Sequence, residues 1–383
     1  MACVARYGAD IPRADDWRDA SVLLGDRPLT LKWLWSPHNV HRIPLPRLIR
    51  LVLYRSAGRD FRAAMFFNVT MMAVAAALML RAAPRLRGAP SRLDVLLPLL
   101  LLGPAHFTTF LWGFQVQFAL SSALFFLAIA VVTSIRAPPS LGRLAVLGAS
   151  LLFQVLTGAN GIALAAPLIV WLAAAVANSR HDRRAAWWVA ATSLALAALV
   201  VAAYPFRLSG QWSMAPLELI VGTFFQFLST AIVAAEPFWP NRALFVAALA
   251  AYGVVLVVRS FRTVPAERWR ASGLLACFAS VVLLGVFVAA GRAEMTIDAG
   301  LQSRYTTLAV ALLVLVYFAT LLYAGTRART TVGVLLLAGA VLAMAVGAAQ
   351  AFGFGEFRRK QLQTLASDAG RGLSIAPSRR ATE

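Results

Sequence analysis

Residues 110–133 read FLWGFQVQFALSSALFFLAIAVVT and contain no Asp, Glu, Lys or Arg. At about 1.5 Å per residue this run forms a helix of about 36 Å, which exceeds the roughly 30 Å hydrocarbon core of a bilayer. A membrane-spanning β-strand would instead be short and would alternate apolar with polar residues. The run therefore predicts a transmembrane α-helix.

Similar apolar blocks recur through most of the chain. The composition agrees, because 60% of the 383 residues are hydrophobic and 14% are charged, whereas a soluble domain is about half apolar and about a quarter charged. Only helices satisfy the backbone polar groups of such runs in lipid, so we predict an all-α polytopic integral membrane bundle. The blocks are 62–80, 92–104, 110–133, 142–157, 159–177, 185–204, 215–235, 241–259, 270–290, 306–324 and 330–350.

Basic residues gather in five short connections between these blocks. The net charge is +20, and the positive-inside rule assigns such connections to the cytoplasmic side. Anionic lipid headgroups then account for the charge, and nucleic acid is not an expected partner. The connections near His106, Thr157, Arg207 and Asp298 face outward in this scheme. The basic connections contain Arg81, Arg85, Arg87 and Arg92; Arg136 and Arg143; Arg180, Arg183 and Arg184; Arg259, Arg262, Arg268 and Arg270; and Arg327 and Arg329.

The number of blocks fits this scheme only if one block fails to cross. Two blocks lie between the outward connection near Arg207 and the basic connection at Arg259, where an odd number of crossings is required. Block 215–235 begins beside Glu218 and ends at Glu236, which suits the outer interface. We therefore predict about ten spans, with 215–235 as a re-entrant or interfacial helix.

The chain divides into three regions. Residues 1–61 are rich in Asp and Trp and contain no block long enough to span, so they form an outward-facing loop in this scheme. Within them, residues 46–54 read PRLIRLVLY, which predicts a short amphipathic helix at the membrane interface. Residues 62–350 form the transmembrane domain, and 351–383 form a polar, basic tail that we expect to be disordered.

The outward placement of residues 1–61 requires a signal or a helix before them, because a polar segment is not otherwise translocated. No such helix is present in this sequence, so we expect one upstream of it. The alternative is that the segment stays cytoplasmic, which its many arginines favour.

An acidic pair, Asp15 and Asp16, directly precedes Trp17. Paired carboxylates are able to bind a divalent cation such as Mg or Mn, and one of them is able to act as a general base. The alternative is structural, with Asp15 capping a helix that begins at Asp16. The sequence alone favours the cap.

A second cluster follows at residues 33–43, which read WLWSPHNVHRI. Here His38, His41 and Arg42 are suited to phosphate, because Arg binds phosphate through two parallel hydrogen bonds and His donates or shuttles a proton. The alternative is an interfacial turn anchored by its tryptophans, which the sequence slightly favours.

Two glutamines, Gln115 and Gln117, begin the span at 110–133. Buried amides in a membrane protein hydrogen-bond between helices or line a substrate path. Neither alternative is preferred by the sequence.

A late polar cluster contains the candidate residues Arg292, Arg304 and Tyr305. An arginine at a membrane edge commonly serves as an anchor in the headgroup layer. On the outer face, however, an arginine runs against the positive-inside trend and favours an anionic partner such as a phosphate or a carboxylate.

In this order, the motifs resemble those of bacterial multi-span membrane proteins related to the glycosyltransferase C superfamily. The similarity extends from about Tyr7 to Tyr323. The motifs that carry it are the acidic pair before Trp17, the run WLW..HN.HRI at 33–43, LWGFQ.QF at 111–118, Asn160-Gly161, Gly291-Arg292 and Ser303-Arg304-Tyr305. Relatives commonly have an acid where this chain has Val40.

The resemblance implies a glycosyltransferase in the bacterial cytoplasmic membrane, with its active face outward. Its donor would be a sugar linked to polyprenyl phosphate, held among membrane lipids, and its acceptor would belong to the cell envelope. Asp15 and Asp16 occupy the place of the family's base or metal ligand. Arg304 would contact the lipid phosphate, with help from His41 and Arg42.

Other functions compete with this one. A transporter or flippase of a lipid-linked saccharide would also use arginines at the membrane edge, and a polysaccharide polymerase or ligase would use the same lipid-linked sugars. The sequence has no P-loop, GxSxG or HExxH motif that would indicate another enzyme class.

Overall fold

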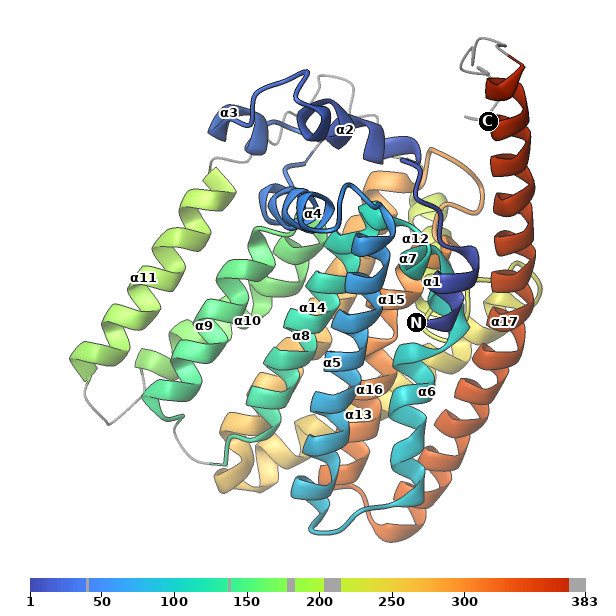
Figure 1. Cartoon of the computed structure of the whole chain (residues 1–383). Coiled ribbons are helices and arrows are strands. Elements are labelled where there is room, and N and C mark those ends of the chain that lie inside the picture. Colours follow the sequence, from blue (N-terminus) through green and yellow to red (C-terminus); the bar gives the residue numbers. More distant parts are fainter. Residues whose placement is uncertain (39–40, 137–138, 178–182, 203–214, 372–383) are drawn as a thin grey trace.

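The computed structural model describes residues 1–38, 41–136, 139–177, 183–202 and 215–371. Asn39 and Val40 of the histidine-containing turn, Arg180 and Arg207 lie outside the described residues. The described chain is a bundle of helices without a β-strand, so the predicted fold class is confirmed (Figure 1).

Each of the eleven predicted blocks is helical. In the described residues, eight helical segments are long and apolar enough to cross a membrane. Two further helices, α9 (Leu141–Val155) and α11 (Arg183–Ala202), pack beside α10 and run alongside it (Figure 1). The eight segments contain α5 (Arg62–Arg87), α6 (Leu96–Leu102) with α7 (Phe107–Phe110), α8 (Val116–Thr133), α10 (Ala159–Ala177), α13 (Trp239–Thr263), α14 (Arg268–Arg292), α15 (Thr306–Ala309) with α16 (Ala311–Tyr323), and α17 (Thr326–Gly370).

The one remaining block, 215–235, contains α12 (Leu217–Ser229). This helix is about 20 Å long and too short to span. Gln226 in α12 hydrogen-bonds to the Ile297 carbonyl at 2.8 Å and accepts from the Gly300 amide at 3.0 Å. After α12 the backbone is non-helical, yet 231–234 is buried. Irregular backbone at membrane depth is tolerated where protein covers it. This block is therefore a short helix followed by covered irregular backbone, which fits the predicted re-entrant or interfacial helix.

Basic connections gather at one end of the bundle, which we call the basic end (81–94, 134–143, 259–270 and 323–329). Arg87 binds Asp94, whose carboxylate also accepts from Tyr317 at 2.5 Å. The Arg270 side chain donates to the Ile135 carbonyl at 3.1 Å. These contacts join connections that are far apart in sequence, as the charge pattern predicted.

Residues 8–61 lie at the opposite end, which we call the site end (Figure 1). This segment contains α2 (Trp17–Leu24), α3 (Leu31–Leu34) and α4 (Pro44–Ser56), while α1 (Ala2–Tyr7) packs along α5 and α17. The predicted helix at 46–54 is present as α4. Arg50 is fully buried, whereas Val52 is 58% exposed, because α4 turns its arginines toward acidic and aromatic partners in the protein.

The expectation of a disordered tail was wrong as far as Gly370, because α17 continues beyond the span. α17 is held by close contacts along one face. A Cβ on Gly347 would lie 2.4 Å from the Ala105 backbone, and a Cβ on Gly355 would lie 2.6 Å from the Tyr7 ring. The two glycines let α17 approach the bundle and then α1. Residues 372–383 lie outside the described residues.

Candidate functional site

The site end is organised by residues 107–118, which connect α7 to α8. The Asn68 amide of α5 fixes this segment by donating to the carbonyls of Thr109 at 2.8 Å and Trp112 at 3.1 Å. A 3₁₀ turn at Gly113–Gln115 then leads into α8. Side chains of this segment lie beside Asp16, His38, His41 and Tyr305.

Asp16 is buried in a 3₁₀ turn at Ala14–Asp16, with 1% of its surface exposed. Its Oδ2 accepts from the Arg13 backbone amide at 3.2 Å, and its Oδ1 has no protein partner. Trp112 lies close enough to favour the charged carboxylate, but outside the geometry of a hydrogen bond, so its indole N–H is also without a partner. Burial raises the pKa of Asp16 to about 6, against the opposing effect of Arg50.

Asp15 points elsewhere, toward the imidazole of His38, with Oδ1 3.5 Å from Nε2. Arg18 contacts Nδ1 of the same ring at 3.1 Å, and the ring packs on Phe114 with centroids 4.7 Å apart. The hydrogen bond from His38 lowers the pKa of Asp15. The interpretation of Asp15 as a helix cap was wrong, because its carboxylate makes no capping bond at α2.

The described residues do not bring together the ligands that the predicted metal site needs. Asp15 and Asp16 project to different partners, and no group of three or more His, Cys, Asp or Glu side chains suited to a metal ion occurs in the described part of the chain. Two divergent carboxylates do not make a Mg or Mn site of the usual kind.

His38 and His41 close a tight turn through two backbone hydrogen bonds, at 2.6 and 3.1 Å. Gly158, with φ of +128°, lies against this turn, and a Cβ there would be 3.4 Å from His41. Burial lowers the pKa of His41 to about 4, helped by the charge of Arg292 and opposed by a hydrogen bond with Gln117. His41 is therefore neutral at physiological pH and offers a hydrogen bond rather than a charge. Arg42 donates to the Trp35 carbonyl.

The two glutamines at the start of α8 behave differently. Gln117 reaches His41. Gln115 is 1% exposed, and both of its amide atoms lack a protein partner. Leaving a buried donor or acceptor unsatisfied costs about 1–3 kcal/mol, so such an amide is commonly explained by an absent ligand or water. Gln115 is thus the strongest candidate for substrate contact among the predicted residues.

Arg304 and Tyr305 lie in a 3₁₀ turn just before α15. The Arg304 guanidinium lies 5.5 Å from the Tyr305 ring centroid, and its Nε is buried without a partner. Thr108 and Ser303 hydrogen-bond to each other, which fixes this turn to the 107–118 segment. Arg304 therefore shares the site end with the acidic pair, but no described contact joins Arg304 to Asp15 or Asp16. Arg292 reaches the Met295 sulfur at 3.1 Å.

One essential pair was not predicted from the sequence. Arg50 of α4 binds Asp19 of α2 at 2.5 Å, with both side chains buried, and its guanidinium lies 4.6 Å from the Phe114 ring centroid. Both residues were visible as charges, but nothing in the sequence paired positions so far apart. The pair connects the N-terminal segment to the 107–118 segment and neutralises an arginine whose charge acts on both Asp15 and Asp16.

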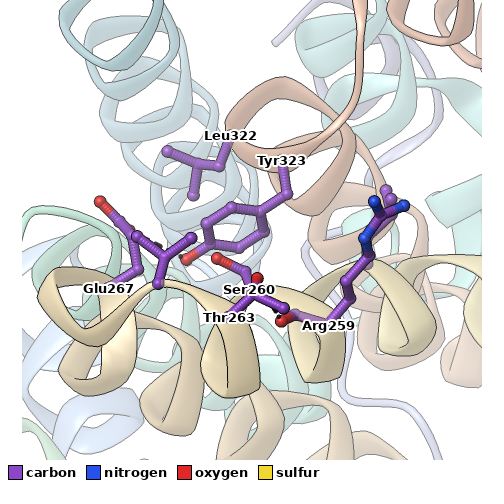
Figure 2. A pocket seen from close by; sticks show the side chains of 8 residues that line it. Arg259, Ser260, Thr263, Glu267, Leu322 and Tyr323 are labelled. Carbon is purple, nitrogen blue, oxygen red and sulfur yellow. Dashed lines mark hydrogen bonds between the residues drawn. The ribbon is translucent and has the colours of Figure 1, made fainter.

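A polar cavity of about 420 Å³ lies at the basic end, between α13 and the end of α16 (Figure 2). The Tyr323 hydroxyl donates to Glu267 at 3.2 Å, and Arg270 binds the same carboxylate at 3.2 Å. Figure 2 shows Arg259 on the opposite side of the cavity from Glu267. None of the predicted site residues lines this cavity.

Comparison with known proteins gives no relative: no protein-family model, curated protein or solved structure matches the chain. The resemblance in the motifs therefore stays an expectation, and the functional argument rests on the residues at the site end.

Proposed function

We propose that this chain is a membrane glycosyltransferase that moves a sugar from a polyprenyl-phosphate donor to a cell-envelope acceptor. The observation that carries the proposal is the buried carboxylate of Asp16, with a pKa near neutrality and an oxygen without a partner. A general base works best when its pKa lies near the working pH. Perturbed carboxylates also concentrate at functional sites.

In the proposed reaction, Asp16 accepts the proton of an acceptor hydroxyl. The hydroxyl oxygen bonds to the anomeric carbon as the bond from that carbon to the phosphate oxygen breaks. The electron pair leaves with the polyprenyl phosphate, and the anomeric configuration is inverted. Arg304 offsets the growing negative charge, while neutral His41 and the Gln115 amide hydrogen-bond to the substrates.

Asp15 has a positioning role in this scheme. Its bond to His38 ties the acidic turn to the turn that contains His41. Because His38 also packs on Phe114, one displacement would shift the base, the imidazole and the start of α8 together. Asp15→Asn should therefore reduce transfer less than Asp16→Asn does.

The experiment is transfer in lipid nanodiscs from a panel of radiolabelled polyprenyl-phosphate hexoses and pentoses to envelope lipid acceptors. The parent protein should transfer one of these sugars, Asp16→Asn should lose nearly all transfer, and Arg304→Ala should lose a smaller part of it. Asp60→Asn is the matched control, because Asp60 lies in the same segment but pairs with Arg62 away from Asp16. Equal transfer by Asp16→Asn and the parent would rule out Asp16 as the base.

A flippase of a lipid-linked saccharide is the second candidate, favoured by the short helix α12 and the buried irregular segment that follows it. Transporters build substrate sites from such interrupted helices. Movement of an intact lipid-linked saccharide across a vesicle membrane, with no sugar transferred, would favour this function. Transfer without movement would exclude it.

A further inference from the structure

The part of α17 beyond the span brings a second set of cationic side chains to the site end. Arg13 lies between two rings, with its guanidinium 4.9 Å from the centroid of Trp112 and 4.9 Å from that of Phe354. Phe354 in turn packs on Phe107, at 5.1 Å between centroids. α17 and the 107–118 segment thus lie on either side of the Arg13 guanidinium.

Arg358 lies one turn beyond Phe354 and is only 7% exposed. No carboxylate lies within 4.0 Å of Arg358 or of Arg13 among the residues that the structure describes. The Arg13 Nη1 atom is buried and makes no hydrogen bond. Burial, and then the like charge of Arg358, lower the pKa of Arg13 to about 10. Two arginines therefore face each other with little compensation.

The nearby acids offset only part of this charge. Asp16 acts on both arginines, but one carboxylate carries one negative charge against two guanidinium groups. Asp19 is already paired with Arg50 at 2.5 Å. Because a buried cation without a full counter-charge is strongly destabilising, the arrangement favours an additional anion.

We propose that Arg13 and Arg358 bind a phosphate group beside Asp16, carried by a membrane lipid or free in solution. Two guanidinium forks match the paired oxygens and the double charge of phosphate better than they match a single-atom anion. The unpartnered indole N–H of Trp112 supplies a further donor at the same place. This inference goes beyond the proposed transfer reaction, because its site would serve a flippase equally well.

The test uses the full chain in phosphatidylcholine nanodiscs and measures binding by tryptophan fluorescence and by thermal stabilisation. Farnesyl phosphate is the lipid-borne probe, farnesol is its uncharged counterpart, and inorganic phosphate is the free probe. Arg358→Ala should weaken binding of the phosphate probe about tenfold or more, and Arg358→Lys should retain part of it, because lysine keeps the charge but not the fork.

Arg359→Ala is the matched control, since Arg359 is the next residue, is exposed, and pairs with Glu356 at 3.1 Å. Equal losses in Arg358→Ala and Arg359→Ala, or equal binding of farnesol and farnesyl phosphate, would overturn the proposal. Tighter binding of farnesyl phosphate than of inorganic phosphate would identify a lipid as the source, and the reverse would identify solution phosphate. If Arg358→Ala fails to fold, Arg358→Lys decides. Sugar transfer is not the readout, so failure of the transferase proposal leaves this result unaffected.

Discussion

The two ends of the bundle differ in whether their arginines are paired with carboxylates. At the basic end, Arg87 and Asp94 approach to 2.5 Å, and Arg270 lies 3.2 Å from Glu267. Tyrosine hydroxyls complete both clusters, Tyr317 on the first and Tyr323 on the second. Each of these arginines thus has a carboxylate partner, which is the arrangement of a structural connection.

At the site end only part of the charge is paired. Arg50 has its carboxylate partner, but Arg13, Arg304 and Arg358 make no ion pair in the part of the chain that the structure describes. Removing a paired charge should therefore cost stability, because its partner is left buried and alone. Removing an unpaired charge should cost function and little stability.

The largest expected effect is that of Asp16→Asn. We expect sugar transfer to fall about 10²–10⁴-fold, the usual contribution of a general base. At pH 8 the variant should nevertheless be more stable, by up to about 3 kcal/mol, since a charged Asp16 opposes burial. Transfer assays and thermal unfolding of the same nanodisc sample test both parts. A variant that lost activity and stability together would show a structural role.

The pH dependence of stability gives the sign of this effect. The pKa of Asp16 is about 6 in the folded protein and 3.8 in a model compound. The stabilisation from its protonated form is therefore full below about pH 4 and is lost as the pH rises through about 6. Asp16→Asn should remove this component, so the difference between variant and parent should grow from pH 4 to 7. A constant difference would contradict the assignment.

Replacing Arg50, which is paired with Asp19, should lower the stability of the protein. Arg50→Ala leaves Asp19 buried without a counter-ion, and we expect a loss of about 3–5 kcal/mol in unfolding free energy. The double variant Arg50→Met with Asp19→Leu should recover much of that loss, because it removes both charges. Chemical or thermal unfolding in detergent measures this. A double variant as unstable as the single one would show that the contact of Arg50 with Phe114 matters more than the ion pair.

A smaller effect on activity should follow from Arg304→Ala. The residue has no ion pair to break in the described chain, so unfolding should change by less than about 1 kcal/mol. Transfer should fall about 10–100-fold if the guanidinium stabilises the leaving phosphate. Arg304→Lys should restore part of the activity. Normal transfer by Arg304→Ala would remove this residue from the mechanism.

The helices could be predicted from the sequence because lipid leaves the backbone few choices. An apolar run of spanning length must be helical, and each predicted block contains a helix in the described residues. Counting charges on either side of block 215–235 also singled out the block whose helix, α12, is too short to span. The site end was less predictable, since the directions of Asp15 and Asp16 depend on partners from distant segments, namely His38 and Arg13.

What the sequence did not predict has the same origin. The burial of Arg50 of α4 against Asp19 and Phe114 was not predicted, because the local pattern of apolar residues does not reveal such partners. The tail appeared disordered because it is locally polar. Its helix is held by contacts with residues near the other terminus, such as Tyr7. Contacts between such distant positions have no local signal.

The smallest expected effect is that of Gly355→Ala, which tests the packing of α17 against α1. A Cβ on Gly355 would lie 2.6 Å from the Tyr7 ring, whereas a Cβ on Gly353 would meet nothing within 4 Å. Gly355→Ala should therefore cost about 1 kcal/mol through overpacking, while Gly353→Ala should be neutral or slightly stabilising in a helix. Hydrogen exchange should increase in α1 and in residues 351–370 of Gly355→Ala alone. Because the basic end contains neither contact, its hydrogen exchange should stay unchanged. Faster exchange at both ends would mean that the stabilities of the two ends are coupled through α17.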